Sequence, residues 1–184
     1  MKKTVVIGVA GSSACWKVCA LIEELQKKMS GEVIIRVVMT HSSAHFIQPL
    51  MFQILTHQHV YLEVADEPDV EKISHVHLAQ SCDLFLVAPA TFNTIGKLAQ
   101  GVADNMLTTV ASAVPAATPK FLAPAMNDAM YNQEVLKENL AKLKERGYEE
   151  IPPRVDILAS GKKAIGALAE VSEIVALIVE KLQD

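Results

Sequence analysis

Two polar clusters follow apolar runs at spacings suited to binding an anion or a carboxylate. The first extends from Ala88 to Thr94, directly after the apolar stretch 83–87. Thr91, Asn93 and Thr94 carry side-chain oxygens of the kind that accept hydrogen bonds from the free N–H groups of a first helical turn. A buried strand that ends in such a helix start is where open α/β sheets bind anionic ligands.

The second cluster is Pro124–Ala125–Met126–Asn127, which Met130 and Tyr131 follow. The Asn127 amide has two hydrogen-bond donors for a carboxylate or for a carbonyl close to a cofactor. Spacing alone favours a plainer interpretation, in which Asn127 caps a helix and Met130 and Tyr131 pack against it. The residues themselves leave both interpretations open.

All six histidines lie between residues 41 and 77, as the pairs His41/His45, His57/His59 and His75/His77. Zinc needs three or four converging ligands, and no cysteine or aspartate stands at a fitting spacing, so we expect no metal site. Most of these histidines are expected to be ordinary hydrogen-bonded or surface residues. His75 differs because it lies one helix upstream of the strand 83–88 and could act as an acid or base in the same cleft.

The composition excludes several classes of function. A formal charge of −4 without a Lys/Arg cluster argues against nucleic-acid and anionic-membrane partners. No apolar run approaches the ~20 residues that span a bilayer, and the first run is too short for a signal peptide, so we expect a cytoplasmic protein. Walker loops, G-x-S-x-G elbows and spaced catalytic carboxylates are missing from the sequence, so NTPase and serine hydrolase activities lack support.

The elements that must position these clusters alternate along the chain. Apolar runs at 4–9, 32–39, 83–88 and 119–123 predict buried strands, and the segments between them have helical periodicity or capping signals. The alternation predicts one α/β domain over 1–184, built as a three-layer α/β/α doubly wound parallel sheet. Ligand contacts are then expected at the strand ends, at residues 9–13, 40–46, 88–94 and 123–127.

Other segments are less regular. Residues 56–70 are interpreted as a mixed acidic loop, 148–151 as a short last strand, 152–168 as a mobile loop and 170–182 as a closing helix. The three cysteines are an odd number without a CxxC pair, so disulfides are not expected.

Three segments together resemble the family of homo-oligomeric flavin-containing cysteine decarboxylases. Residues 88–94 resemble its PASANT motif, 124–131 its PxMNxxMW motif and 74–78 its histidine segment. Residues 11–17, 101–108 and 167–170 also match, so the resemblance extends over nearly the whole chain. It implies a Rossmann-like flavoprotein that forms a homotrimer or a multiple of trimers, with sites at subunit interfaces.

The resemblance also implies an FMN site at the strand ends already identified. The FMN phosphate would be held by the 11–13 turn, Thr40 and the helix start at Thr91, and Phe46 would pack beside the isoalloxazine. His75 would be the catalytic histidine, and Asn127 with Met130 would bind the substrate carboxylate. The implied cofactor-binding residues are Gly11, Ser12, Ser13, Thr40, Phe46, Ala88, Pro89, Ala90, Thr91, Thr94 and Asp104.

The implied reaction is FMN-dependent decarboxylation of the cysteine moiety of 4'-phosphopantothenoylcysteine to give 4'-phosphopantetheine, a step of coenzyme A biosynthesis. A cysteine carboxylate has no electron sink, so the flavin oxidises the side chain to a thioaldehyde that accepts the electrons released with CO2. The resulting enethiol is returned to a saturated thiol with the help of a flap cysteine in an Ala-Cys-Gly segment.

The sequence departs from the family at three positions. Phe92 replaces a small residue, Tyr131 replaces Trp, and Ala159–Ser160–Gly161 stands in place of Ala-Cys-Gly. A hydroxyl is not a redox partner comparable to a thiol. The chain is therefore the coenzyme A pathway enzyme with a serine at position 160, a peptidyl-cysteine decarboxylase that stops at the enethiol, or a non-catalytic flavin-binding protein. The full-length match, flap included, favours the first.

Overall fold

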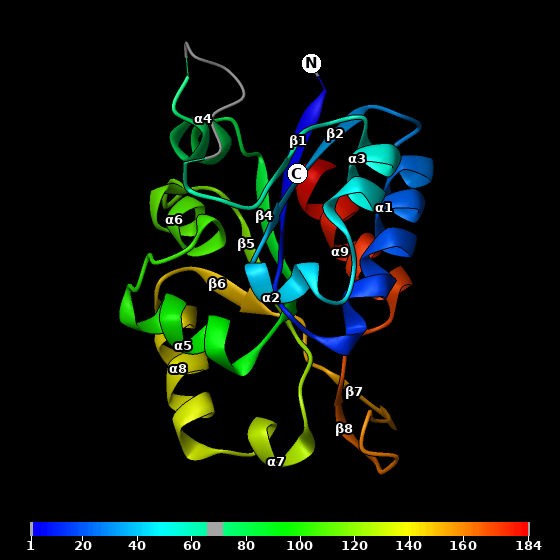
Figure 1. Cartoon of the computed structure of the whole chain (residues 1–184), viewed down its shortest axis with the longest axis vertical. Helices are drawn as coiled ribbons and strands as arrows, with labels where there is room; N and C mark the ends of the chain where they lie inside the picture. Colours follow the sequence, from blue (N-terminus) through cyan, green and yellow to red (C-terminus); the bar gives the residue numbers. More distant parts are fainter. Residues whose placement is uncertain (1, 66–71, 184) are drawn as a thin grey trace.

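The chain folds around a parallel β-sheet, seen in a computed structural model that describes residues 2–65 and 72–183 (Figure 1). Within that part of the chain the sheet has six strands in the order β3-β2-β1-β4-β5-β6. The strands are β1 (Lys3–Val9), β2 (Val33–Met39), β3 (Val60–Tyr61), β4 (Leu84–Ala90), β5 (Lys120–Pro124) and β6 (Tyr148–Glu150). The predicted doubly wound α/β fold is confirmed.

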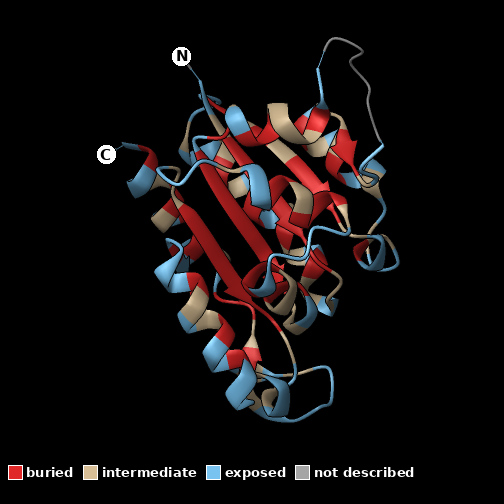
Figure 2. Cartoon of the chain, turned by 90° about the vertical axis from the view of Figure 1, so that its left-hand side faces the viewer, coloured by how far each residue is buried: buried red, intermediate tan, exposed pale blue. Residues whose placement is uncertain are grey.

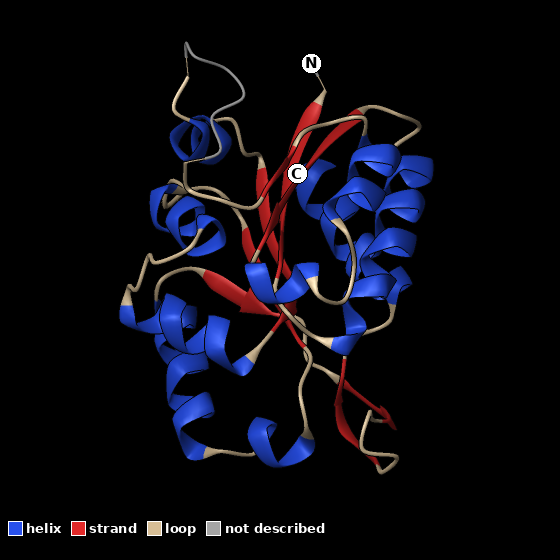
Figure 3. Ribbon diagram, in the orientation of Figure 1, coloured by secondary structure: helices blue, strands red, loops and turns tan. Residues whose placement is uncertain are grey.

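Helices cover both faces of the sheet, which makes three layers (Figure 3). One core forms beneath α1 (Lys17–Lys28), α3 (Pro49–Thr56) and α9 (Val171–Gln183), and it includes Leu21, Phe52 and Ile174. The other forms beneath α4 (Ser74–Gln80), α5 (Phe92–Gln100), α6 (Met106–Ala113) and α8 (Glu134–Glu145). Because both faces are covered, β4 and β5 are buried along their whole length and β1 along most of it, as Figure 2 shows.

Short elements gather at the carboxyl ends of the strands. They are the 3-10 helix η1 (Ser13–Trp16), α2 (His41–Ala44), α7 (Asp128–Tyr131) and a hairpin of β7 (Arg154–Ile157) and β8 (Lys163–Ala167). Figures 1 and 3 show α7 and the hairpin projecting beyond the sheet. These elements surround the end of the sheet where ligand contacts were expected.

Two segments interpreted as loops contain strands. Val60 and Tyr61 lie inside the predicted loop 56–70 and pair with Val37 and Val38 as an edge strand, which is too short to show a sequence pattern. Residues 66–70 of that range lie outside the described residues. The predicted loop 152–168 contains the β7–β8 hairpin, whose strands are half-exposed and so lack a continuous apolar run. In the residues that the structure describes, none of the helices is long and apolar enough to cross a bilayer.

The core makes a direct prediction for stability. Phe85 is fully buried in the core beneath α4, α5, α6 and α8. Phe85→Ala should lower the free energy of unfolding by about 3–5 kcal/mol, because it removes buried apolar surface and leaves a cavity. Urea denaturation measures the change, with the half-exposed Val135→Ala as a control expected to stay within ~0.5 kcal/mol. A loss below ~1 kcal/mol for Phe85→Ala would contradict the packing described.

Candidate active site

The site lies where the strand order reverses, between β1 and β4. From β1 the chain proceeds outward to β2 and β3 on one side, and from β4 to β5 and β6 on the other. The loops that follow β1 and β4 therefore diverge and leave a crevice at their carboxyl ends, which is the usual ligand site of such sheets.

Helix starts converge on this crevice, each capped by a side-chain oxygen. Ser12 Oγ accepts from Ala14 N at 3.2 Å, and Thr40 Oγ1 accepts from Ser43 N at 3.3 Å. Thr91 Oγ1 accepts from Thr94 N at 3.2 Å, and Asn105 Oδ1 accepts from Thr108 N at 3.1 Å. The caps confirm the helix start predicted at Thr91, and they leave other first-turn N–H groups available to an anion.

Gly11 permits the turn after β1 to approach α2 closely. A Cβ added at Gly11 would lie 2.5 Å from Ser42 Cβ and 2.9 Å from the Ser42 carbonyl carbon. A side chain at position 11 would therefore push the turn and α2 apart, and both of them border the crevice.

A hollow of about 700 Å³ occupies the crevice. It brings together most of the residues that sequence reasoning assigned to a cofactor, together with Met130 of the second cluster. Those it places on the wall are Gly11, Ser12, Ser13, Thr40, Phe46, Thr91, Thr94, Asp104 and Met130. Phe46 is 56% exposed, so its ring is available to a flat ligand.

Ala88, Pro89 and Ala90 are not among the lining residues of this hollow. They form the buried end of β4, where the Ala88–Pro89 peptide bond is cis. Their carbonyls join neighbouring strand ends, since Ala10 N donates to Pro89 O at 3.3 Å and Ala125 N to Ala90 O at 3.1 Å. They shape the floor of the crevice through the backbone.

Sequence reasoning did not single out Lys97, which is the cation of this hollow wall. Its Nζ lies 2.6 Å from Asp104 Oδ2, and the hydrogen bond from Lys97 holds the pKa of Asp104 below its usual range. The two residues face each other across the loop between α5 and α6. Helical spacing from the Thr91 cap would have placed Lys97 on the α5 face that leads toward this loop, but it could not have shown the pairing. The strand-end ranges predicted from the sequence also supply His41, Ser42, Phe92, Asn93, Ala125 and Met126 to the wall, whereas Asn105 and Ala159 lie outside those ranges.

A second hollow of about 390 Å³ adjoins the first and shares Ser12, Ser13, Ala125, Met126 and Ala159 with it. Its other lining residues include Lys17, Asn127 and Ser160. The two segments that hold Asn127 and Ser160 are far apart in the sequence and meet here.

Asn127 caps α7, as the plainer interpretation of its motif predicts. Its Oδ1 accepts a hydrogen bond from Ala129 N at 2.9 Å, which caps α7. The cap uses the side-chain oxygen and leaves the Nδ2 group as a hydrogen-bond donor. Asn127 is exposed and borders the second hollow. Capping therefore orients the amide and does not compete with its use as a donor.

The hairpin is docked on the backbone that carries Asn127. Met126 N donates to Gly166 O at 2.9 Å, and Gly166 has a φ of +135°. A Cβ at Gly166 would lie 2.2 Å from Met126 O, so only glycine fits this contact. None of the three cysteines lines either hollow, and burial raises the pKa of Cys15 and raises that of Cys82 to about 11.

His75 stands apart from both hollows. It lies in the first turn of α4, the helix that leads into the start of β4, and it is not a lining residue of either hollow. Figure 1 places α4 at the amino-terminal end of the sheet. Its Nδ1 is buried and has no hydrogen-bond partner among the described residues. Across that same part of the chain, no group of three or more His, Cys, Asp or Glu could hold a metal ion.

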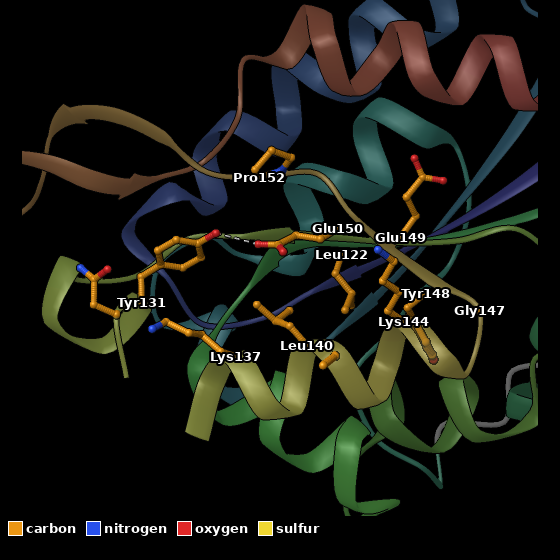
Figure 4. A pocket seen from close by; sticks show the side chains of 12 residues that line it. Leu122, Tyr131, Lys137, Leu140, Lys144, Gly147, Tyr148, Glu149, Glu150 and Pro152 are labelled. Atoms are coloured by element: carbon orange, nitrogen blue, oxygen red, sulfur yellow. Dashed lines mark hydrogen bonds between the residues drawn. The ribbon is translucent and has the colours of Figure 1, made fainter. Parts of the chain in front are cut away.

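A separate hollow of about 880 Å³ lies on the other side of α7, between α8 and the edge strand β6 (Figure 4). Tyr131 reaches it from α7 and donates to Glu150 Oε1 at 2.9 Å. Burial and this carboxylate raise the pKa of Tyr131, so the phenol stays a neutral donor. The hydroxyl gives Tyr131 a contact that the Trp of the motif could not make in this form.

Comparisons with known proteins agree with this geometry. A family model described as Flavoprotein matches residues 1–183. The chain is 43% identical over 182 residues to a probable phosphopantothenoylcysteine decarboxylase of Streptococcus mutans serotype c, covering 99% of this chain and 100% of the relative. It is 41% identical over 175 residues to the coenzyme A biosynthesis bifunctional protein CoaBC of Bacillus subtilis, covering 95% of this chain but 42% of that protein.

Solved structures with the same fold include two decarboxylases. One is a PPC decarboxylase mutant, with serine in place of a cysteine, complexed with pantothenoylaminoethenethiol; it has a TM-score of 0.82 and 31% identity and covers 100% of both chains. The other is the FMN-dependent cysteine decarboxylase SpaF, with a TM-score of 0.82 and 27% identity, covering 98% of this chain and 97% of that chain.

The Lys97–Asp104 pair yields a prediction for titration. Lys97→Met should raise the Asp104 pKa toward its ordinary value of 3.8, because it removes the hydrogen bond that lowers the pKa. In the unmodified chain, the pair stabilises the fold fully at pH values above the ordinary Asp pKa. That stabilisation is lost as the pH falls through the lowered pKa of Asp104. NMR titration of the Asp104 carboxyl measures the shift. Lys142→Met is the control, since Lys142 bonds to Gln100 instead; an unchanged Asp104 pKa in Lys97→Met would contradict the pairing.

Proposed function

We infer the function from the premise that this chain belongs to the flavoprotein family, whose model matches residues 1–183. The chain is an FMN-dependent phosphopantothenoylcysteine decarboxylase, a carboxy-lyase of coenzyme A biosynthesis. The observation that carries this is the meeting of a cofactor-sized hollow lined by helix starts with a second hollow that contains Asn127. The relatives of the same name, one of them matched over its whole length, agree with it.

The residues of the crevice hollow of about 700 Å³ fit FMN. Gly11 lets the turn after β1 approach α2 closely, so that the hydroxyls and first-turn N–H groups at Ser12, Thr40 and Thr91 can bind one phosphate. We assign the isoalloxazine to the part of the hollow beside Phe46, with Lys97 and Asp104 at its edge. When bound, FMN supplies the two-electron oxidation of the substrate's cysteine side chain to a thioaldehyde.

The protein's part in the reaction is to position the substrate. Asn127 Nδ2 donates to the carboxylate that is to be lost, and Met130 packs beside it from α7. Oxidation leaves a C=S group next to the carbon that bears the carboxylate, so the electron pair of the breaking C–C bond enters the thiocarbonyl and CO2 departs. The product is an enethiol, and the main contribution of Asn127 is to hold the carboxylate so that the breaking C–C bond is parallel to the π orbital of the C=S group.

His75 is proposed as the catalytic acid or base of a neighbouring subunit's site. Within its own chain it lines neither hollow, and its Nδ1 has no partner in the described residues. A homotrimer, or a multiple of trimers, would bring one subunit's α4 to another subunit's crevice. The half-exposed ring of Phe46 and the exposed Ile73 beside α4 are apolar surfaces consistent with such an interface. The unpaired thiols favour a cytoplasmic location.

Ser160 supports a narrower alternative, in which this chain stops at the enethiol. It borders the hollow that contains Asn127, and none of the three cysteines lines that hollow. A decarboxylase mutant with serine in place of a cysteine is complexed with an enethiol compound. A serine here would likewise leave the enethiol without a thiol to complete its reduction.

The role of His75 can be tested by substitution. His75→Asn should abolish the bleaching of bound flavin by phosphopantothenoylcysteine, because proton transfer is lost, while FMN remains bound since His75 does not line the FMN hollow. Anaerobic absorbance spectra measure both. His77→Asn, on the same helix, is the matched control and should bleach normally. Normal bleaching in His75→Asn with loss in His77→Asn would reverse the assignment.

Ser160 determines which product is expected. Under the narrower alternative, the unmodified chain should yield the enethiol, whereas Ser160→Cys should yield 4'-phosphopantetheine, two hydrogens heavier. Mass spectrometry of the products distinguishes the two, with Ser160→Ala as the control for loss of the hydroxyl. If the unmodified chain and Ser160→Ala both turn over to the saturated thiol, residue 160 has no part in the second half of the reaction.

A further inference from the structure

We propose that Lys162 and Asp128 are positioning residues that hold the hairpin closed over the substrate. The flap is defined here as residues 154–167, and the clamp helix as α7 with Asn127 at its start. The inference rests on the proposed function, because it concerns how Ser160 and Asn127 are brought to one substrate. It depends on an ion pair that joins the tip of the flap to the clamp helix.

The position of Ser160 is coupled to the position of Lys162. Its Nζ lies 2.5 Å from Asp128 Oδ2, and the hydrogen bond from Lys162 holds the pKa of Asp128 below its usual range. Inside the tip, Leu158 N donates to Lys162 O at 2.9 Å, and Gly161 N donates to Leu158 O at 2.8 Å. The tip is closed on itself, so fixing Lys162 fixes Ser160.

The base of the flap is held by other contacts. Arg154 pairs with Asp156 at 2.6 Å and with Glu170 at 2.9 Å. Gly166 is docked on Met126 through the backbone. Nearer the tip, Val155 and Ile157 are 56% and 69% exposed and contribute little packing. The tip therefore depends on its polar contact with α7 much more than the base does.

The clamp helix is a firm partner for this contact. Tyr131, at the end of α7, is tied to β6 through Glu150. Asp128, at its beginning, has only 17% of its side chain exposed, while the Lys162 side chain is 64% exposed. Opening of the flap moves the exposed lysine and leaves the aspartate in place. Because Asp128 directly follows Asn127, closure sets Ser160 in register with the amide that binds the carboxylate.

Amide hydrogen exchange tests this without cofactor or substrate. Lys162→Met and Asp128→Asn should each speed exchange of residues 157–163 by about two- to fivefold, as expected for loss of one partly exposed pair. The double variant should exchange no faster than either single variant, since both remove the same contact. Lys162→Arg should behave as the unmodified chain. Lys163→Met is the matched control, because Lys163 directly follows Lys162 at the start of β8, is exposed and should leave exchange unchanged.

A kinetic measurement separates positioning from general loss of structure. Lys162→Met should raise KM by a similar factor and leave the flavin bleaching rate at saturating substrate nearly unchanged, because closure affects capture. Additive effects in the double variant, equal acceleration in Lys163→Met, or unchanged exchange in Lys162→Met would overturn the proposal. Failure of phosphopantothenoylcysteine to bleach the unmodified chain would instead overturn the proposed function, while the exchange result would still stand on its own.

Discussion

Everything at the site depends on the backbone hydrogen bonds that join the strand ends where the strand order reverses. Thr40 N donates to Val9 O at 3.0 Å, Ala10 N to Pro89 O, and Ala125 N to Ala90 O. These bonds continue the sheet past the strands and start the following loops at one level. The caps at Ser12, Thr40 and Thr91 consequently face one crevice, and the free first-turn N–H groups make it suitable for a phosphate.

The position of Asn127 depends in turn on the short helix α7, which is held at both of its ends. α7 is capped by Asn127, whose side-chain oxygen accepts from the helix and whose residue borders the second hollow. Its far end is tied to the edge strand through Tyr131 and Glu150. A helix of four residues has little stability by itself, so these contacts hold it. Asn127 is thus held by the cap of α7, and α7 is held in turn by the hydrogen bond from Tyr131 to Glu150.

The sequence predicted the layers of the fold and much of the crevice because both arise from local signals. Apolar runs identified the long strands. The polar residues at Thr91 and in the 11–13 turn predicted the helix starts that follow two of these strands. Val60–Tyr61 and the β7–β8 hairpin escaped prediction, since one is too short and the other too exposed to leave a pattern. The Lys97–Asp104 and Lys162–Asp128 pairs join separate elements, so only the fold reveals them. The assignment of His75 stays a prediction, because His75 lines neither hollow within its own chain.

The central claim is that this chain removes the carboxylate of a cysteine by flavin-dependent oxidation. The most direct measurement is anaerobic mixing of the FMN-loaded protein with phosphopantothenoylcysteine labelled with carbon-13 in the cysteine carboxylate. The account predicts labelled CO2 in step with loss of the flavin absorbance, in equal amounts. Flavin that stays oxidised while the label stays in the substrate would contradict it.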